Sequence, residues 1–172
     1  PTSGASNVSP GPPLHLMGSL IFMMGEFEAE FPTERLYAKN HMWALQVEST
    51  QPVVTRFGFA AYAVRLLQDV YFLEWYFDAP AQVAAHQEMG TVESKKAESS
   101  LYVPVGGALT QFNPRLLADP SCINVDKYGD GWLFEMQCDP LEHETLMSAK
   151  QYLEHLEQVW KITQQTIKGQ LN

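Results

Sequence analysis

Residues 89–107 read Met-Gly-Thr-Val-Glu-Ser-Lys-Lys-Ala-Glu-Ser-Ser-Leu-Tyr-Val-Pro-Val-Gly-Gly, and this stretch decides the fold. Apolar and β-branched residues mark its two ends, over 89–93 and 100–105, as is typical of strands. Residues 94–97, which follow the first run, are small or charged and suit an exposed turn. The stretch therefore predicts an antiparallel hairpin that presents two lysines at its tip.

Short strand signals on both sides of this hairpin predict a mainly β protein. Period-two alternation and β-branched or aromatic runs indicate further strands over 43–49, 53–57, 70–77, 108–112 and 132–138. The spacing over 58–67 favours one or two helical turns. Together these signals predict short antiparallel strands packed as a small sandwich or flattened barrel.

Two further helices are expected after the hairpin. The Asn-Pro pair at 113–114 predicts a short internal helix, because Asn caps a helix well and Pro is favoured at its first position. Apolar residues at helical spacing predict a C-terminal helix over 148–168, with Ser148 as its cap.

The chain is predicted to divide into an N-terminal extension and one domain. Its 172 residues suffice for a single domain with a real core. Residues 1–13 are rich in Pro, Gly and Ser and carry no charged side chain, so they bury too little apolar surface to order themselves. We expect residues 1–24 to be an extension that is disordered or foreign to the native chain, with Met23 or Met24 as a candidate start. Residues 25–172 should form the domain.

Charge and composition argue against several classes of protein. The chain has 20 acidic and 11 basic residues and a net charge of −9. Such a chain lacks the clustered Lys and Arg that nucleic acids require, and it should be repelled by anionic membranes and attracted to a basic docking face. The longest apolar stretch, 14–24, is too short to span a bilayer. Two cysteines form no disulfide framework in a domain of this size, and the five histidines lack zinc-site spacing.

The lysine-bearing hairpin resembles a known motif. Val92-Glu-Ser-Lys-Lys-Ala97 resembles the lipoylation hairpin of the glycine cleavage system H-protein family, whose pattern is roughly Val-Glu-Ser-Val-Lys-Ala. The resemblance extends over about residues 37–155. Its other segments are His41-Met-Trp43, Tyr62-Ala63, Asp69-Val-Tyr-Phe-Leu-Glu74, Tyr102-Val-Pro-Val-Gly-Gly107, residues 113–124, Tyr128-Gly-Asp-Gly-Trp-Leu133 and Ser148-Ala-Lys-Gln-Tyr152. It implies a lipoyl/biotinyl-carrier fold, a flattened β-barrel and sandwich hybrid of two antiparallel sheets.

The resemblance implies a lipoyl carrier rather than an enzyme. The family's modified lysine falls on Lys96, which would bear covalent lipoate, and Glu93, Ser94 and Ala97 complete the hairpin motif. The carrier would shuttle a lipoate-bound intermediate, the aminomethyl group of glycine, between partner enzymes. The implied partners are a PLP-dependent glycine decarboxylase, a folate-dependent aminomethyltransferase and dihydrolipoyl dehydrogenase, with a lipoate ligase or synthase to install the cofactor. The implied location is the bacterial cytoplasm, or the mitochondrial matrix if the source is eukaryotic.

Two positions depart from the family pattern at the cleft that would receive the loaded arm. Met42, beside His41, replaces the Glu of the family's His-Glu-Trp, and Ser100 replaces an Asp that commonly follows the modified lysine by four residues. Acids at both places would help to hold a cationic aminomethyl group. Three interpretations stay open: glycine cleavage, lipoate carriage in another pathway such as sulfur metabolism or lipoyl donation, and an interaction module without lipoate.

Other motifs carry less information. Biotin carriers usually flank their lysine with Met, whereas Lys95 and Ala97 flank Lys96 here. The segment 126–130 faintly resembles a calcium loop but lacks the closing Glu, so a turn is expected. No nucleophile–base pair supports a free-standing enzyme. The aromatic run over 71–77 is expected to be a core strand, or a docking patch if it is exposed.

Overall fold

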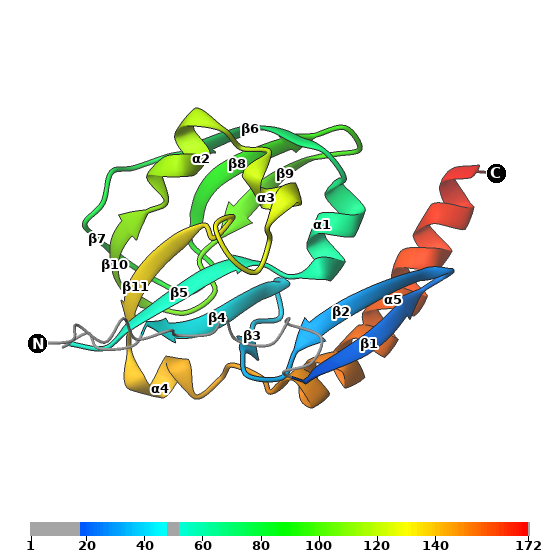
Figure 1. The fold of residues 1–172 in the computed structure, drawn as a ribbon, viewed down its shortest axis with the longest axis horizontal. Helices are drawn as coiled ribbons and strands as arrows, with labels where there is room; N and C mark the ends of the chain where they lie inside the picture. The colour runs from blue at the N-terminus through cyan, green and yellow to red at the C-terminus, as the bar shows by residue number, and fades with distance from the viewer. Residues whose placement is uncertain (1–17, 48–51, 172) are drawn as a thin grey trace, which may run out of the picture.

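The chain is mainly β, as the sequence predicts. The computed structural model describes residues 18–47 and 52–171, and for 166–171 the backbone alone. In this part of the chain the strands form three antiparallel sheets, and five helices lie between or after them (Figure 1).

The two larger sheets face each other across the main core. The six-stranded sheet has the order β3 (Leu36–Tyr37), β4 (Met42–Val47), β5 (Val54–Phe59), β11 (Phe134–Cys138), β10 (Gly107–Phe112) and β7 (Ala81–Val83). The three-stranded sheet has the order β6 (Val70–Trp75), β8 (Glu88–Ser94) and β9 (Glu98–Tyr102). Leu73 and Val92 of the smaller sheet join Phe57 and Phe134 of the larger one in one buried apolar cluster. The predicted sandwich is therefore confirmed, but neither sheet closes into a barrel.

Two helices begin where the sequence predicts them to begin. The internal helix α2 (Pro114–Ala118) starts at Asn113, whose side-chain oxygen accepts a hydrogen bond from the Arg115 amide at 3.1 Å. The C-terminal helix α5 (Ala149–Leu171) starts after Ser148, whose hydroxyl accepts from the Gln151 amide at 3.2 Å. The other helices are α1 (Ala61–Leu67), α3 (Cys122–Val125) and α4 (Pro140–His143).

For residues 19–24 the predicted disorder of the extension is wrong, whereas the alternative, that the extension is foreign to the native chain, stays a prediction. These residues form strand β1 (Ser19–Met24), which pairs in regular antiparallel register with β2 (Phe27–Pro32) as a third, two-stranded sheet. The predicted number of two sheets is corrected to three for the same reason. Residues 1–17 lie outside the described residues.

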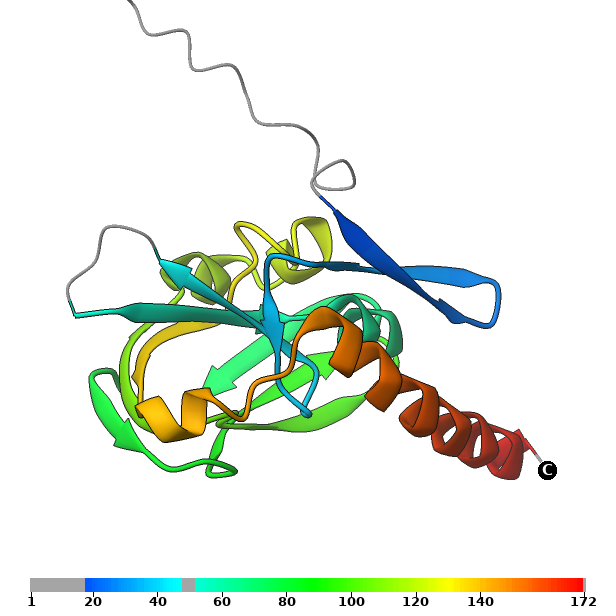
Figure 2. The same ribbon diagram turned by 90° about the horizontal axis from the view of Figure 1, so that it is seen from below.

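The N-terminal hairpin β1–β2 is ordered because its inner face fills a second core. Ala29 and Phe31 are fully buried there against Tyr37 and Tyr152, in a cluster that α1 and α5 complete. The hairpin and α5 extend from the same side of the sandwich in both ribbon views (Figures 1 and 2). Composition alone concealed this, because the inner face of the hairpin packs on α1 and α5, which lie far away in sequence.

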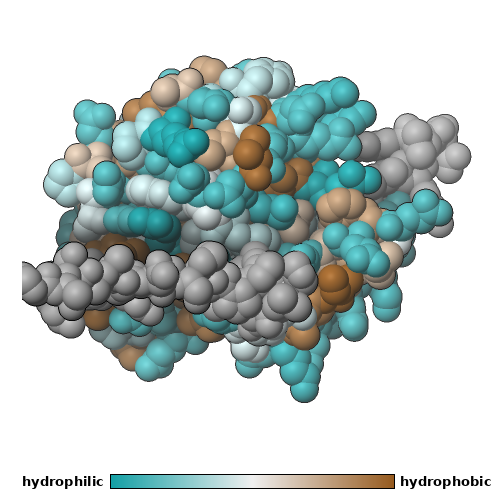
Figure 3. All heavy atoms as spheres, in the orientation of Figure 1, coloured by the Kyte–Doolittle hydropathy of each residue, from teal (hydrophilic) through white to brown (hydrophobic). Residues whose placement is uncertain are grey.

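The outer face of the N-terminal hairpin is mixed. Ile21 and Met23 are about half exposed, at 49% and 47%, and Glu28 beside them is exposed as well. Hydrophobic and hydrophilic atoms accordingly lie side by side over β1 and β2 (Figure 3). Among the described residues, no helix has the length and apolar character needed to cross a membrane.

Candidate functional site

The predicted hairpin exists and carries its lysines at the tip. Strands β8 and β9 pair in antiparallel register as far as Glu93 and Glu98, which leaves residues 94–97 as the connecting turn. Lys95, Lys96 and Ala97 are exposed there. A lysine amine in this position is open to an enzyme that approaches from solvent.

Ser94 holds the turn from inside. Its side chain is buried, donates a hydrogen bond to the Ala97 carbonyl at 3.1 Å, and accepts from the amides of Ala97 and Lys96 at 3.2 and 3.4 Å. The Ser94 amide adds a bond to the Ala97 carbonyl at 2.8 Å. Four contacts on one four-residue turn fix the backbone from which the Lys96 side chain leaves.

The base of the hairpin is fixed as well. The Lys95 amide donates to the Asp69 carbonyl at 2.9 Å, which ties the tip to the start of β6. Glu93 is half-buried in β8, between Phe72 of β6 and Glu98 of β9. Of the four predicted motif residues, Ser94 therefore shapes the turn, while Glu93 offers a carboxylate beside it.

A cleft of about 390 Å³ opens next to the hairpin. It brings together His41, Met42 and Ser100, the three residues predicted to line an arm cleft, although Met42 and Ser100 are far apart in sequence. Ala97, the neighbour of Lys96, lines the same cleft. The remaining walls are largely apolar and come from Phe59, Ala63, Leu66, Leu67, Val92 and Leu101.

Helix α1 forms a wall of the cleft that the sequence did not identify. Its residues Ala63, Leu66 and Leu67 lie along the cleft, and Leu66 remains 38% exposed. The sequence signal was the pair Leu66-Leu67 at the end of a short helix, of which Leu66 is exposed and Leu67 is buried. Only the tertiary structure, which places α1 and the hairpin along the same cleft, makes it meaningful.

Asn40 is a second lining residue that the sequence did not identify. Its amide nitrogen donates to the Tyr102 carbonyl at 3.1 Å and contacts the Met42 sulfur at 3.7 Å. Its buried side-chain oxygen has no hydrogen-bond partner among the described residues. The residue thereby supports Met42 and leaves one neutral acceptor at the cleft.

His41 lies at the inner end of the cleft and is tied to α5. Its Nδ1 atom lies 2.7 Å from the Tyr152 hydroxyl, and its ring centroid is 4.5 Å from that of Tyr62. Burial lowers the pKa of His41 to about 4, and the nearby His155 ring adds to this shift. The imidazole is therefore neutral at neutral pH, and the cleft gains no positive charge from it.

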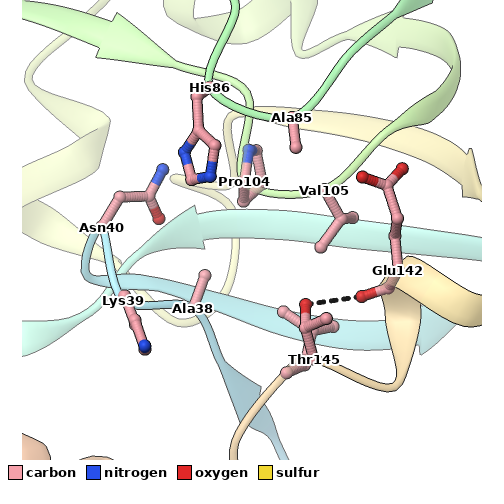
Figure 4. A pocket seen from close by; sticks show the side chains of 10 residues that line it. Ala38, Lys39, Asn40, Ala85, His86, Pro104, Val105, Glu142 and Thr145 are labelled. Carbon is pink, nitrogen blue, oxygen red and sulfur yellow. Dashed lines mark hydrogen bonds between the residues drawn. The ribbon is translucent and has the colours of Figure 1, made fainter.

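A separate pocket of about 290 Å³ contains none of the predicted site residues. Lys39, His86 and Glu142 line it together with Asn40, which also borders the cleft (Figure 4). The Thr145 hydroxyl donates to the Glu142 carbonyl at 2.6 Å along one wall. This pocket holds charges of both signs, unlike the cleft beside the hairpin.

Metal-binding candidates do not gather in the described parts of the chain, where no group of three His, Cys, Asp or Glu side chains lies close enough to hold an ion. The segment that faintly resembles a calcium loop is a turn, in which an Asp126 carboxylate oxygen accepts from the Asp130 amide at 2.8 Å.

Comparisons with known proteins show which family shares this hairpin and cleft. A family model described as Glycine cleavage H-protein matches residues 35–159. The glycine cleavage system H protein of Rubrobacter xylanophilus is 36% identical over 130 residues, which cover 76% of this chain and 98% of that protein. The one of Halothermothrix orenii is 35% identical over 129 residues, covering 74% and 97%.

A solved structure is also similar. The crystal structure of a glycine cleavage system H protein from Mycobacterium marinum superposes with a TM-score of 0.60 at 29% identity, covering 74% of this chain and 98% of that one. The matched range of the family model includes the lysine hairpin and the cleft, and it begins after the N-terminal hairpin β1–β2.

Proposed function

The chain belongs to the glycine cleavage H-protein family, and from that premise we propose that Lys96 bears a lipoyl group in amide linkage to its Nζ atom. Proteins of this family are lipoyl carriers rather than catalytic enzymes, and they hold lipoate covalently on a lysine. The chain is accordingly a lipoyl carrier of glycine cleavage. The observation that supports Lys96 best is its exposure at the tip of a turn that Ser94 fixes from inside.

The residues around Lys96 fit a lipoyl group. Amide formation removes the charge of the lysine and leaves a long arm that ends in an apolar dithiolane ring. The cleft beside Ala97 offers this ring an apolar surface, with Met42 and Phe59 buried in its floor. Lipoate, when bound, supplies the redox and group-carrying chemistry, while the protein positions and presents it.

His41, Met42 and Ser100 are proposed to contact the arm. His41 contributes a neutral ring, Met42 a soft thioether that adapts to the shape of its neighbour, and Ser100 a hydroxyl at the β9 edge. Glu93 is proposed to be recognised by the enzyme that attaches lipoate, because Glu93 lies beside the turn but does not line the cleft.

The family works with the enzymes of glycine cleavage. For this chain the individual partners are proposed to be a PLP-dependent glycine decarboxylase, a folate-dependent aminomethyltransferase and dihydrolipoyl dehydrogenase, with a lipoate ligase or synthase for loading. The bacterial cytoplasm is the proposed location. The net charge of −9 supports docking to basic surfaces of these enzymes rather than to nucleic acid or anionic membranes.

Intact-mass analysis tests the attachment site. The protein, incubated with lipoate, ATP and an active lipoate ligase, should gain one lipoyl adduct, and Lys96→Arg should abolish it. Lys95→Arg is the matched control and should keep the adduct, because the two lysines share the turn but only Lys96 occupies the family position. An adduct that persists in Lys96→Arg and disappears in Lys95→Arg would place the attachment site at Lys95. No adduct in any of the three proteins would refute lipoylation.

A further inference from the structure

The cleft beside Lys96 has no formal charge on its described lining. No Asp, Glu, Lys or Arg side chain contributes to it, and the one imidazole on its lining, that of His41, is held neutral by burial, which lowers its pKa. The polar groups that remain, such as the Asn40 amide and the Ser100 hydroxyl, are neutral.

The hairpin β8–β9 is called the lipoyl hairpin here because Lys96 is proposed to bear lipoate. Its acidic residues add no negative charge to the cleft lining. Glu93 and Glu98 face each other across β8 and β9, yet neither lines the cleft, although their neighbours Val92 and Ser99 do. Glu98 is exposed, so its field is strongly screened by water. Lys95, exposed on the same turn, keeps its positive charge after Lys96 has been acylated.

The apolar walls of the cleft favour neutral groups over cations. Met42 is 1% exposed and Phe59 is 5% exposed, and both line the cleft at its buried floor. A neutral organic group gains by covering such surface. A cation that enters loses hydration and finds no carboxylate in exchange, which costs far more than burying a neutral polar group.

We infer that this cleft docks the lipoyl arm in its uncharged forms and excludes an arm that carries a cationic cargo. The inference rests on the proposed attachment at Lys96 and deepens it. The empty arm would lie against Met42, and the cationic arm would stay in solvent, where partner enzymes can reach it. Protection of the arm is thus greatest when it is unloaded.

Two probes of equal size separate charge from shape. The lipoylated protein is reduced and its arm thiols are alkylated with 2-bromoethanol, which adds a neutral hydroxyethyl group, or with 2-bromoethylamine, which adds a cationic aminoethyl group. Docking is read from the ¹³C-methyl NMR signal of Met42, assigned with Met42→Leu. Lys96→Arg, treated with the same reagents, gives the signal of the empty cleft and accounts for alkylation of the two cysteines.

The neutral arm should shift the Met42 signal away from its position in Lys96→Arg, and the cationic arm should leave it there, with a docking constant at least about tenfold smaller. Ser100→Asp should let the cationic arm dock, because it adds a carboxylate at the half-buried β9 edge, and Ser100→Asn is the isosteric control that should not. Both variants avoid a change in the buried core.

Equal shifts from both arms in the unmodified sequence, or no shift from either, would overturn the inference while the lipoyl adduct remains visible by mass. A Ser100→Asp variant that excludes the cationic arm as strongly as Ser100→Asn would also overturn it, because charge would then not be the cause. Absence of the lipoyl adduct before alkylation is a different failure, and it would remove the proposed function and this inference together.

Discussion

Two hairpins of this protein use the same local structure for opposite purposes. The lipoyl hairpin β8–β9 ends in an exposed turn with two lysines, and a buried Ser94 fixes that turn. The N-terminal hairpin β1–β2 places its inner face, with Ala29 and Phe31, on α1 and α5. One hairpin presents its tip to solvent, whereas the other packs one face on the rest of the fold.

The contrast separates the hairpin with the proposed attachment site from the hairpin that contributes mainly to stability. The lipoyl hairpin lies within the range that the family model matches, whereas the N-terminal hairpin precedes it. The two belong to different apolar clusters, and His41 lies between them: it lines the cleft and contacts Tyr62 and Tyr152 of the second cluster. Substitutions in the N-terminal hairpin should therefore affect stability more than lipoylation. Substitutions in the lipoyl turn should affect lipoylation more than stability.

The largest effect is expected from Phe31→Ala in the N-terminal hairpin. Phe31 is fully buried, with its ring centroid 5.9 Å from that of Tyr37 and 5.4 Å from that of Tyr152. Its truncation should lower the free energy of unfolding in urea by about 3–5 kcal/mol, because it leaves a cavity as well as lost apolar burial. The lipoyl adduct should still form on the fraction that remains folded.

Ile21→Ala is the matched control for that experiment. Ile21 lies on the outer face of the same hairpin and is 49% exposed, so its truncation should cost no more than about 0.5 kcal/mol. An equal loss of stability in both variants would show that the outer face is covered in solution, and the contrast between the two faces would then be wrong.

A smaller effect is expected from the pH dependence of His41, which joins the two regions. The folded-state pKa of His41 is about 4 because of burial, against 6.5 for an unperturbed His. Below pH 6.5 the unfolded chain therefore binds the proton first, and the free energy of unfolding falls as the pH decreases from about 6.5 to about 4. The contribution is fully present above pH 6.5, and its loss amounts to at most about 3 kcal/mol.

His41→Asn tests this contribution, because asparagine tolerates the positive φ of 69° that His41 adopts. The difference in stability between the parent protein and this variant, measured in urea, should shrink as the pH decreases from 6.5 to 4. Burial also lowers the pKa of His155, so that residue should leave a slope of the same sign in both proteins. A constant difference over this range would contradict the assignment to His41.

Apart from the control variants, the smallest change in stability is expected at the lipoyl turn, from Ser94→Ala. The variant removes the hydroxyl that contacts the Ala97 carbonyl and two amides, which should cost about 1 kcal/mol. The rate of lipoylation should nonetheless fall several-fold, since the turn no longer holds Lys96 in one place. Ser99→Ala is the control, because Ser99 is exposed and its hydroxyl donates to the Ser100 carbonyl of the same strand, so both quantities should stay near the parent values. A Ser94→Ala protein that is lipoylated at the parent rate would show that the turn needs no such support.

Local pattern predicted the lipoyl hairpin well, because its signals lie within a few residues of one another. A turn of small and charged residues between two short apolar runs leaves few other structures open. Asn113 and Ser148 could be recognised as helix caps for the same reason, since each bonds an amide two or three residues away. The N-terminal hairpin could not be predicted in this way, because Ala29 and Phe31 find their partners in α1 and α5.

Sequence patterns alone predict a mainly β chain and a lysine at a turn, and they place Met42 and Ser100 where acids are common in the family. Only the tertiary structure decided that these two residues share one cleft with His41, that α1 supplies an apolar wall, and that Glu93 and Glu98 stay outside it. The physical reason is distance along the chain. Turns and caps form between near neighbours, whereas a cleft and its charge depend on which remote segments the core brings together.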